Sequence, residues 1–275
     1  MSKYDSGWVE EFYDEYGDKE WQRLTRTPFD EVSLYVHTHY LERYVQPSSR
    51  VFEIGAGAGR FTQVLAGLDC RILVADISPV QLDLNRMHGE ESGFAKAVED
   101  WVQLDVCDLG DLEPASFDAV VCYGGALSYV FERAAEAVGG CTRVLKKDGA
   151  FLASVMSLWG TAHNALRGVL DVPVEHNKRI TDTGDLTPEN YPTGHHFCHM
   201  YHAGELRVLL ERVGLKVVAM AASNCLSTQW SDLLVEIRHD AEKWTELLRL
   251  ELEATQEPGC LDMGTHLIAV ARKPE

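Results

Sequence analysis

The segment Arg50-Val-Phe-Glu-Ile-Gly-Ala-Gly-Ala-Gly-Arg60 decides the fold of this chain. Its first five residues form a short apolar run with the composition of a β-strand, and the run enters a cluster of glycines. Glycine permits sharp backbone turns, and its missing side chain lets a ligand approach the N-terminus of a following helix. The pattern therefore predicts a strand at 50–54, a tight turn containing Gly55, Gly57 and Gly59, and a helix at 61–67.

The segments after this turn alternate between strand-like and helix-like patterns. Strands are predicted at 71–75, 101–104, 117–123 and 150–156, with helices at 79–87 and 132–145. Such alternation predicts an α/β fold with a parallel sheet and helices on both faces. Further along the chain, the patterns predict a helix at 204–213, a strand at 215–222, a largely helical segment at 231–254 and a strand at 266–271.

Two segments fall outside this alternation. Residues 8–44 mix aromatic and charged residues at spacings near three and four, which predicts two amphipathic helices. Residues 157–200 lose their periodicity and are interrupted by prolines and glycines, as in a long binding loop. We expect residues 1–48 to form a helical cap over a cofactor site, residues 49–275 to form the core, and residues 157–200 to form a lid over the acceptor site.

Composition restricts the classes of function. The 275 residues carry a net charge of −18, which repels nucleic acid at long range. The seven cysteines are scattered without a Cys-x-x-Cys pair, which argues against a disulfide framework and a thiolate zinc site. No apolar run is long enough to span a bilayer, and the acidic N-terminus does not resemble a signal peptide, so we expect a soluble, cytoplasmic protein without a membrane partner.

Acidic residues at predicted strand ends indicate which ligand the glycine turn binds. Glu53 precedes the first glycine by two residues, so a pyrophosphate there would meet like charge, whereas a cationic ligand would be attracted. Asp76 ends the second strand, where an acid can accept both hydroxyl groups of a ribose. Asp105 ends the third and is placed to accept a hydrogen bond from an adenine amino group. Arg60, three residues after Gly57, also departs from the dinucleotide-binding fingerprint, which disfavours a nicotinamide dehydrogenase.

Several motifs in order resemble those of class I S-adenosylmethionine-dependent methyltransferases. They are Glu53-Ile-Gly-Ala-Gly-Ala-Gly59, Asp76-Ile-Ser78, Asp105-Val106, Ser116-Phe-Asp-Ala-Val120 and Arg143-Val-Leu-Lys-Lys-Asp-Gly149, with His202-Ala-Gly-Glu-Leu206 further on. The resemblance implies a Rossmann-like, seven-stranded, mostly parallel sheet whose last strand is antiparallel. It also implies S-adenosylmethionine as the methyl donor, with S-adenosylhomocysteine as its product. Lys147-Asp148-Gly149 departs from the Pro-Gly-Gly that many members have, and we expect no functional effect of that difference.

The resemblance also assigns cofactor contacts residue by residue. Glu53 falls near the methionine ammonium, Asp76 on the ribose, Asp105 and Val106 on the adenine, and Tyr123 with Gly124 beside the transferring sulfur. The N-terminal segment resembles the helices that close over the cofactor in such enzymes, so Tyr16 is expected to cover it and Arg23 to pair with the methionine carboxylate. The complete set of predicted cofactor-binding residues is Tyr16, Arg23, Glu53, Gly55, Ala56, Gly57, Gly59, Asp76, Ile77, Asp105, Val106, Tyr123 and Gly124.

Histidines are concentrated at the end of the expected lid, in Gly194-His-His-Phe-Cys-His-Met-Tyr-His202. Methyl transfer to a hydroxyl or a protonated nitrogen benefits from a general base, and histidine suits that role near neutral pH. We therefore predict that one of His195, His196 or His199 is the base or orients the acceptor, with Tyr129, Trp159 and Tyr201 lining the pocket. A zinc site is the alternative chemistry, but adjacent histidines lack a typical ligand spacing, and polar lid residues without a catalytic role are also consistent with the sequence.

The function expected from the sequence is methyl transfer to an oxygen, nitrogen or sulfur of a small metabolite or natural product. One alternative is an RNA-modifying methyltransferase, because residues 261–274 are similar to the tail of a bacterial enzyme that methylates a carboxymethoxy-uridine in tRNA; the net charge argues against it. A second is a non-catalytic partner protein that binds the cofactor. The sequence leaves a homodimer open, and it does not identify the acceptor.

Overall fold

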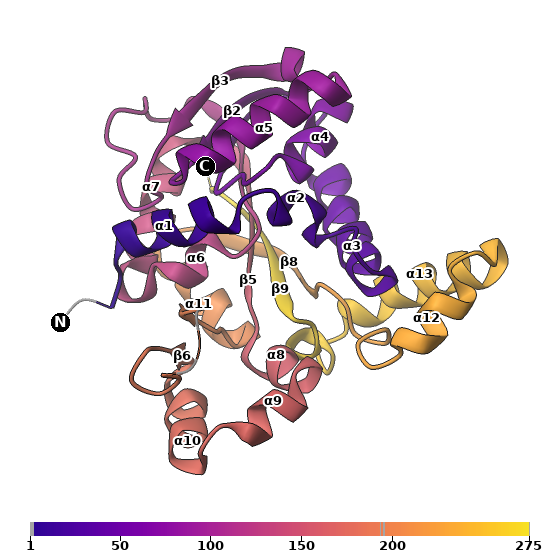
Figure 1. Ribbon diagram of the computed structural model, residues 1–275. Helices are drawn as coiled ribbons and strands as arrows, with labels where there is room; N and C mark the ends of the chain where they lie inside the picture. The colour runs from indigo at the N-terminus through magenta and orange to yellow at the C-terminus, as the bar shows by residue number, and fades with distance from the viewer. Residues whose placement is uncertain (1–2, 193, 195, 275) are drawn as a thin grey trace.

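A computed structural model describes residues 3–192, 194 and 196–274 of the chain (Figure 1). The central sheet has seven strands in the order β3-β2-β1-β4-β5-β9-β8. All pairs among β1 to β5 are parallel, whereas β9 is antiparallel to both β5 and β8. The predicted Rossmann-like sheet with an antiparallel last strand is thus confirmed. The strands are β1 (Arg50–Ile54), β2 (Arg71–Asp76), β3 (Val98–Gln103), β4 (Phe117–Cys122), β5 (Leu145–Met156), β8 (Lys216–Ala222) and β9 (His266–Arg272).

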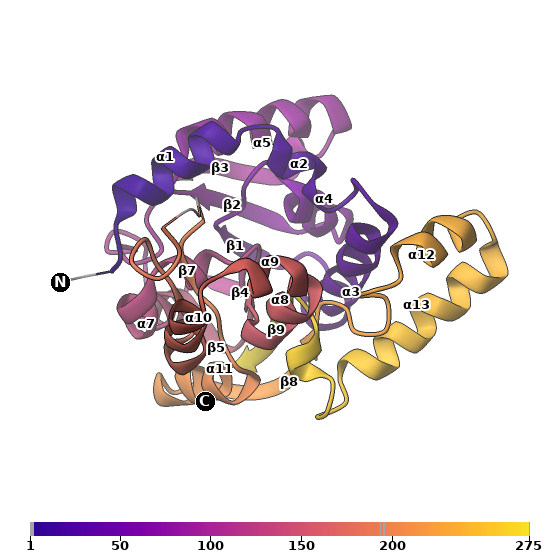
Figure 2. The same ribbon diagram turned by 60° about the horizontal axis from the view of Figure 1, so that its bottom comes forward.

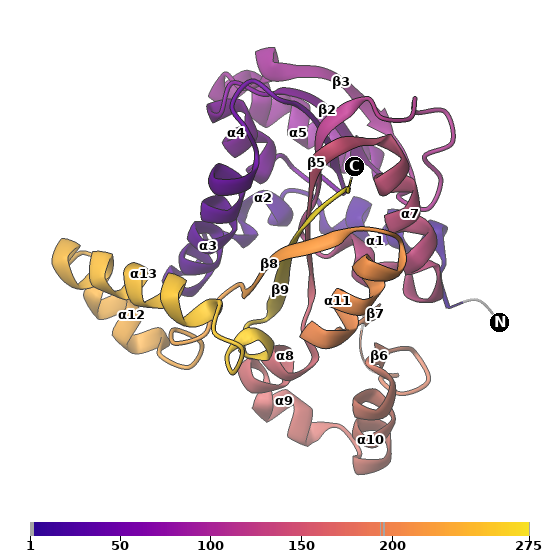
Figure 3. The same ribbon diagram turned by 180° about the vertical axis from the view of Figure 1, so that it is seen from behind.

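Helices cover both faces of this sheet (Figure 2). On one face lie α3 (Pro28–Tyr44), α4 (Arg60–Gly67) and α5 (Pro79–Ser92), whose apolar residues share a core cluster with the inner strands. On the other face α7 (Ala134–Val144) and α11 (Ala203–Arg212) form a second cluster with them (Figure 3). Strands β1, β4 and β5 are buried almost throughout, as expected for parallel strands covered by helices on both sides.

The N-terminal segment forms three helices where the sequence predicted two. These are α1 (Ser6–Tyr16), α2 (Lys19–Arg23) and α3. Gly17 ends α1 with a φ of +55°, a conformation that residues with side chains rarely adopt. Thr27 begins α3 through a reciprocal capping box with Asp30, with Pro28 in the first turn. Gly17 and Thr27 therefore divide the segment into separate helices, although the spacing of its aromatic residues shows no break.

Residues 157–200 are more regular than predicted. They contain α8 (Leu158–Asn164), α9 (Leu166–Asp171), α10 (Val174–Thr183) and a two-stranded hairpin of β6 (Asp185–Leu186) and β7 (Cys198–His199). The expectation of an irregular segment was therefore wrong. Only Leu158, Gly160 and Ile180 are buried in these three helices, so the sequence shows no apolar stripe.

The remaining elements complete the shape of the molecule. Short helical pieces are η1 (Ala95–Ala97), α6 (Ala126–Tyr129), η2 (Phe131–Arg133) and η3 (Leu261–Met263). The segment between β8 and β9 is largely helical as predicted and forms two helices, α12 (Ser231–Ile237) and α13 (Ala241–Thr255), which project from the body beside α3 (Figure 1). Within the described part of the chain, no helix combines the length and apolar character needed to cross a membrane.

Candidate functional site

The glycine turn after β1 adopts a backbone that requires glycine. Gly55, Gly57 and Gly59 have φ values of +70°, +53° and +101°. A Cβ on Gly55 would lie 2.7 Å from the Cβ of Ala126, at the start of α6. One on Gly59 would lie 3.0 Å from the side chain of Asn85. The predicted tight turn is therefore present, and it brings α6 and α5 against the N-terminus of α4.

A cavity opens at the carboxyl ends of β1, β2 and β4, beside this turn. The cavity is narrow, with about 60 Å³ of space for the centre of a water-sized sphere. The end of an open α/β sheet at which the strand order reverses is where such folds bind ligands, and here β1 lies between β2 and β4. Eight of the predicted cofactor residues line the cavity: Gly55, Gly57, Asp76, Ile77, Asp105, Val106, Tyr123 and Gly124.

Asp76 is held in place by the backbone of the turn. Its carboxylate accepts hydrogen bonds from the backbone N–H of Gly57, at 2.8 Å, and of Ser78, at 2.9 Å. Burial raises its pKa to about 6, although these backbone donors work in the opposite direction. An acid held rigidly at the cavity wall can accept hydrogen bonds from the hydroxyl groups of a ligand while it is ionised.

Glu53 lies beneath the turn rather than on the cavity wall. Its side chain is buried, and Oε2 has no hydrogen-bond partner among the described residues. Burial raises its pKa to about 8, the Thr62 hydroxyl lowers it, and the charge of Asp76 raises it further. A buried carboxyl group with an unused acceptor atom fits a cationic group such as the methionine ammonium. Ala56 and Gly59, which were also predicted, belong to the same turn but do not line the cavity.

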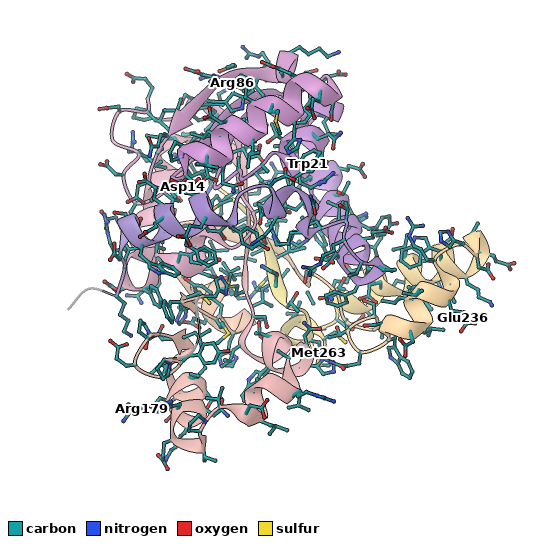
Figure 4. All side chains as sticks on the ribbon, viewed as in Figure 1. Asp14, Trp21, Arg86, Arg179, Glu236 and Met263 are labelled. Atoms are coloured by element: carbon teal, nitrogen blue, oxygen red, sulfur yellow. The ribbon has the colours of Figure 1, made fainter. Side chains whose placement is uncertain are left out.

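The N-terminal segment supplies cavity residues that the sequence did not single out. Tyr4, Val9, Tyr13 and Glu20 line the cavity, and Tyr13 donates a hydrogen bond to the Tyr129 hydroxyl at 2.8 Å. These helices are tied to the core as well. The Ser78 hydroxyl donates to Asp14, and the Trp21 ring stacks on His88; Figure 4 labels Asp14 and Trp21 on this segment.

The two cofactor predictions in this segment differ in outcome. Tyr16 does not line the cavity; its ring stacks on Phe12, and it faces an outer groove. Tyr13, three residues earlier on α1, takes the predicted place. Arg23 forms an ion pair with Glu20 at 2.7 Å, and a Cβ on Gly124 would lie 3.7 Å from its guanidinium. Arg23 is thus beside the cavity, and its pairing with a cofactor carboxylate stays a prediction.

The predicted histidines occupy different environments. His195 lies outside the described residues. His196 Nε2 forms a hydrogen bond with the Tyr129 hydroxyl, and burial lowers the pKa of His196 to about 4, helped by the charge of Arg23. Because this ring nitrogen is engaged by Tyr129, His196 is better placed to orient Tyr129 than to remove a proton.

His199 is unsuited to act as a base, contrary to the prediction. Its Nδ1 lies 2.7 Å from Asp185 and its Nε2 2.8 Å from Glu205. Burial lowers its pKa, but the two carboxylates outweigh burial and raise it to about 9. Both ring nitrogens therefore carry protons at neutral pH and donate them to carboxylates. This histidine joins β7 to β6 and α11, so its role is structural.

We expect His199→Gln to lower the free energy of unfolding at pH 7 by about 1–2 kcal/mol, a value discounted because the Glu205 side chain is 43% exposed. The folded-state pKa is raised, so this stabilisation is complete below the unfolded value of 6.5 and disappears as pH rises through about 9. Urea denaturation of both proteins at pH 6 and pH 10 tests this, since the two curves should converge at the higher pH. A difference that persists at pH 10 would exclude the charged pairing.

The three predicted acceptor-pocket aromatics are separated in the structure. Tyr129 lines the cavity as expected. Trp159 is 49% exposed on α8, and Tyr201 is buried in the core, where its hydroxyl donates to the Leu127 carbonyl at 3.2 Å. Neither of these two lines the cavity. Among the described residues, no group of three His, Cys, Asp or Glu side chains could hold a metal ion.

Comparison with known proteins agrees with this geometry. Residues 52–153 match a family model described as a methyltransferase domain. This part of the chain is a methyltransferase domain. A ubiquinone biosynthesis O-methyltransferase from Xylella fastidiosa is 32% identical to this methyltransferase over 123 residues, covering 44% of this chain and 48% of the relative. One from Xanthomonas axonopodis pv. citri is 26% identical over 183 residues, covering 66% and 69%. The chain spans about half the length of the first such curated relatives.

Solved structures share the fold of this methyltransferase over most of its length. An S-adenosylmethionine-dependent methyltransferase from Mesorhizobium loti aligns with a TM-score of 0.58 at 18% identity, covering 86% of this chain and 97% of that one. A possible histamine N-methyltransferase from Thermotoga maritima aligns with a TM-score of 0.57 at 17% identity, covering 97% and 99%. At these identities the likeness concerns the fold alone.

Proposed function

We propose that this methyltransferase transfers a methyl group from S-adenosylmethionine to a small-molecule acceptor by in-line displacement. The observation that carries the proposal is the placement of two buried acids, Glu53 and Asp76, around the glycine turn, with Asp105 further along the cavity. Glu53 offers a free acceptor atom to a cation, and Asp76 is fixed for a ribose. S-adenosylmethionine combines these features, and when bound it supplies a methyl group on a positively charged sulfur.

The protein's own contribution is to hold the reactants and to exclude water. The backbone of the turn and Asp76 would fix the nucleoside, and Arg23 would attract the methionine carboxylate. Tyr13, Tyr129 and His196 form a hydrogen-bonded row from α1 through α6 to the segment before β7. We propose that this row closes the site, with residues 1–48 as the cap and 157–200 as the lid of the 49–275 core.

This enclosure favours a small acceptor. The rings of Trp8 and Phe197 lie 5.4 Å apart and extend the contact between cap and lid. A folded RNA would have to displace these aromatic contacts and would meet the net charge of −18. The curated relatives are named ubiquinone biosynthesis O-methyltransferases, which supports oxygen as the methylated atom.

Calorimetric titration with S-adenosylmethionine, S-adenosylhomocysteine and NAD tests the donor. We expect the first two to bind with micromolar dissociation constants and NAD not to bind, because Arg60 stands where the dinucleotide-binding fingerprint has glycine or alanine. Transfer of a radiolabelled methyl group is then measured with a panel of small phenols, amines and thiols, and with bulk tRNA. Labelled tRNA with no labelled small molecule would favour the RNA alternative. Absence of binding by both sulfur ligands would contradict the proposed function altogether.

A further inference from the structure

Three imidazole groups lie close enough to Arg23 for its charge to lower the pKa of each. They come from α3 (His37), from the segment before β7 (His196) and from the first residue of β9 (His266). The rings of His37 and His266 lie 6.3 Å apart, and the ring of His37 lies 5.1 Å from that of Tyr123. Of the three, only His196 was predicted from the sequence to take part in catalysis, so His37 and His266 have no assigned role.

His266 lies against the turn that follows β4. A Cβ on Gly125 would lie 3.8 Å from His266 Nε2, and one on the adjacent Gly124 would lie 3.7 Å from the Arg23 guanidinium. The Gly124–Gly125 turn is therefore flanked by an imidazole and a guanidinium. Because Gly124 lines the cofactor cavity, His266 borders the region next to it.

The backbone around His266 is held rigidly. Its N–H donates to the Ser223 hydroxyl at 3.1 Å, its carbonyl accepts from the Ser223 N–H at 2.8 Å, and it pairs with Met156 in the sheet. His266 as a whole is half-buried, whereas His37 is buried. A fixed backbone holds the imidazole ring in one place, which a proton acceptor needs.

Both unassigned histidines have an unused ring nitrogen. His37 Nδ1 lies 2.8 Å from the Ser33 carbonyl and so must donate, which leaves Nε2 with the lone pair. Among the described residues, Nε2 of His37 and Nε2 of His266 have no hydrogen-bond partner. Burial lowers the pKa of His37 to about 4 and that of His266 well below its usual value, and the charge of Arg23 acts in the same direction for both.

We propose that His266 accepts the proton of the acceptor's hydroxyl group and that this hydroxyl is acidic, as in a phenol or an enol. The proposal rests on the proposed function. The proton moves to Nε2 of His266, and the electron pair stays on the oxygen, which becomes an anion ready to attack. Arg23, which pairs with Glu20 and is proposed to attract the methionine carboxylate, lies across the Gly124–Gly125 turn and adds positive potential there.

The acidity of the acceptor follows from the surroundings of His266. The groups that face it are Arg23 from α2, already paired with Glu20, together with His37 from α3 and His196 from the lid. Because these groups are positive or neutral, protonation of His266 is unfavourable until a negatively charged ligand lies beside it. An alcohol would hold its proton too strongly, whereas a phenol can exchange its proton for the combined attraction of imidazolium and guanidinium.

The test uses 4-nitrophenol as a chromogenic probe of an acidic hydroxyl group, with the protein saturated by S-adenosylhomocysteine. At a pH below the probe's own pKa, we expect the bound probe to show the phenolate absorbance band. Calorimetry in two buffers of different ionisation enthalpy should show no proton released to solvent, because His266 retains it. His266→Gln cannot retain the proton. In this variant we expect either no phenolate band, or a phenolate band accompanied by release of one proton to solvent for each probe molecule bound.

Two variants serve as controls. His239→Gln changes an exposed histidine between α12 and α13 and should behave as the wild type. His37→Gln should keep the wild-type proton balance, and a change there but not in His266→Gln would overturn the assignment. Failure of the wild-type complex to bind the probe, or an unchanged band and proton balance in His266→Gln, would also overturn it. Because binding of S-adenosylhomocysteine is measured first, its failure identifies an error in the proposed function instead.

Discussion

Asp76→Ala is expected to weaken binding of S-adenosylmethionine by about 100-fold to 10,000-fold. Two hydrogen bonds from ribose hydroxyls to a buried carboxylate contribute about 1.5–3 kcal/mol each, and each 1.4 kcal/mol corresponds to tenfold in affinity. The same carboxylate also orders the glycine turn through Gly57 N–H. The loss should therefore exceed that of the ribose contacts alone. Calorimetric titration measures it directly.

The wild-type affinity should also depend on pH through the same residue. The pKa of Asp76 in the ligand-free protein is raised to about 6, so below that pH the carboxyl group must lose a proton before it can accept both hydroxyl groups. Below pH 6 we expect the wild-type affinity to fall about tenfold more per pH unit than that of Asp76→Asn, in which only Glu53 still has to ionise. Asp83→Ala, on the exposed side of α5, is the matched control. A loss of only a few-fold in Asp76→Ala would remove Asp76 from the cofactor site.

The sheet and the glycine turn were predictable because each depends on local sequence. Apolar runs that end in glycine or an acid mark parallel strands, and the run at Arg50–Ile54 is buried as its composition requires. Asp76 was also predictable, since an acid at the end of the second strand must lie at the same edge of the sheet as the turn. These features carry most of the cofactor side of the site.

The acceptor side depends on contacts between distant segments, which the sequence does not reveal. Tyr13 and Tyr16 are close on the same helix, and only the packing of α1 decides which of them faces the cavity. His37 and His266 are brought together because α3 packs against β9. The histidine-rich stretch at 194–202 was conspicuous, yet His199 there is held by Asp185 and Glu205. The local enrichment in histidine therefore did not indicate which histidine could act as a base.

Glu53→Gln is expected to stabilise the ligand-free protein at pH 8 by roughly 2–5 kcal/mol. Burial raises the pKa of Glu53 from 4.5 to about 8, so the folded state favours the protonated form. Its contribution to stability is therefore complete below pH 4.5 and is lost as pH rises through about 8. Glutamine keeps the shape of the protonated acid and does not ionise. Urea denaturation at pH 5 and pH 8 should show wild-type stability falling with pH and the variant's stability falling less.

The same substitution should change how the protein binds its cationic ligand. The neutral carboxyl group of the free protein must ionise to attract an ammonium group, so binding of S-adenosylmethionine at pH 7 should release about one proton in the wild type and almost none in Glu53→Gln. In Glu53→Gln the affinity for S-adenosylmethionine should fall while the folded state becomes more stable. A variant with a damaged fold would instead lose both affinity and stability. Glu90→Gln, on the exposed face of α5, should leave both quantities unchanged. If Glu53→Gln released as many protons as the wild type, another group would bind the ammonium, and the unpaired Oε2 would be a structural feature alone.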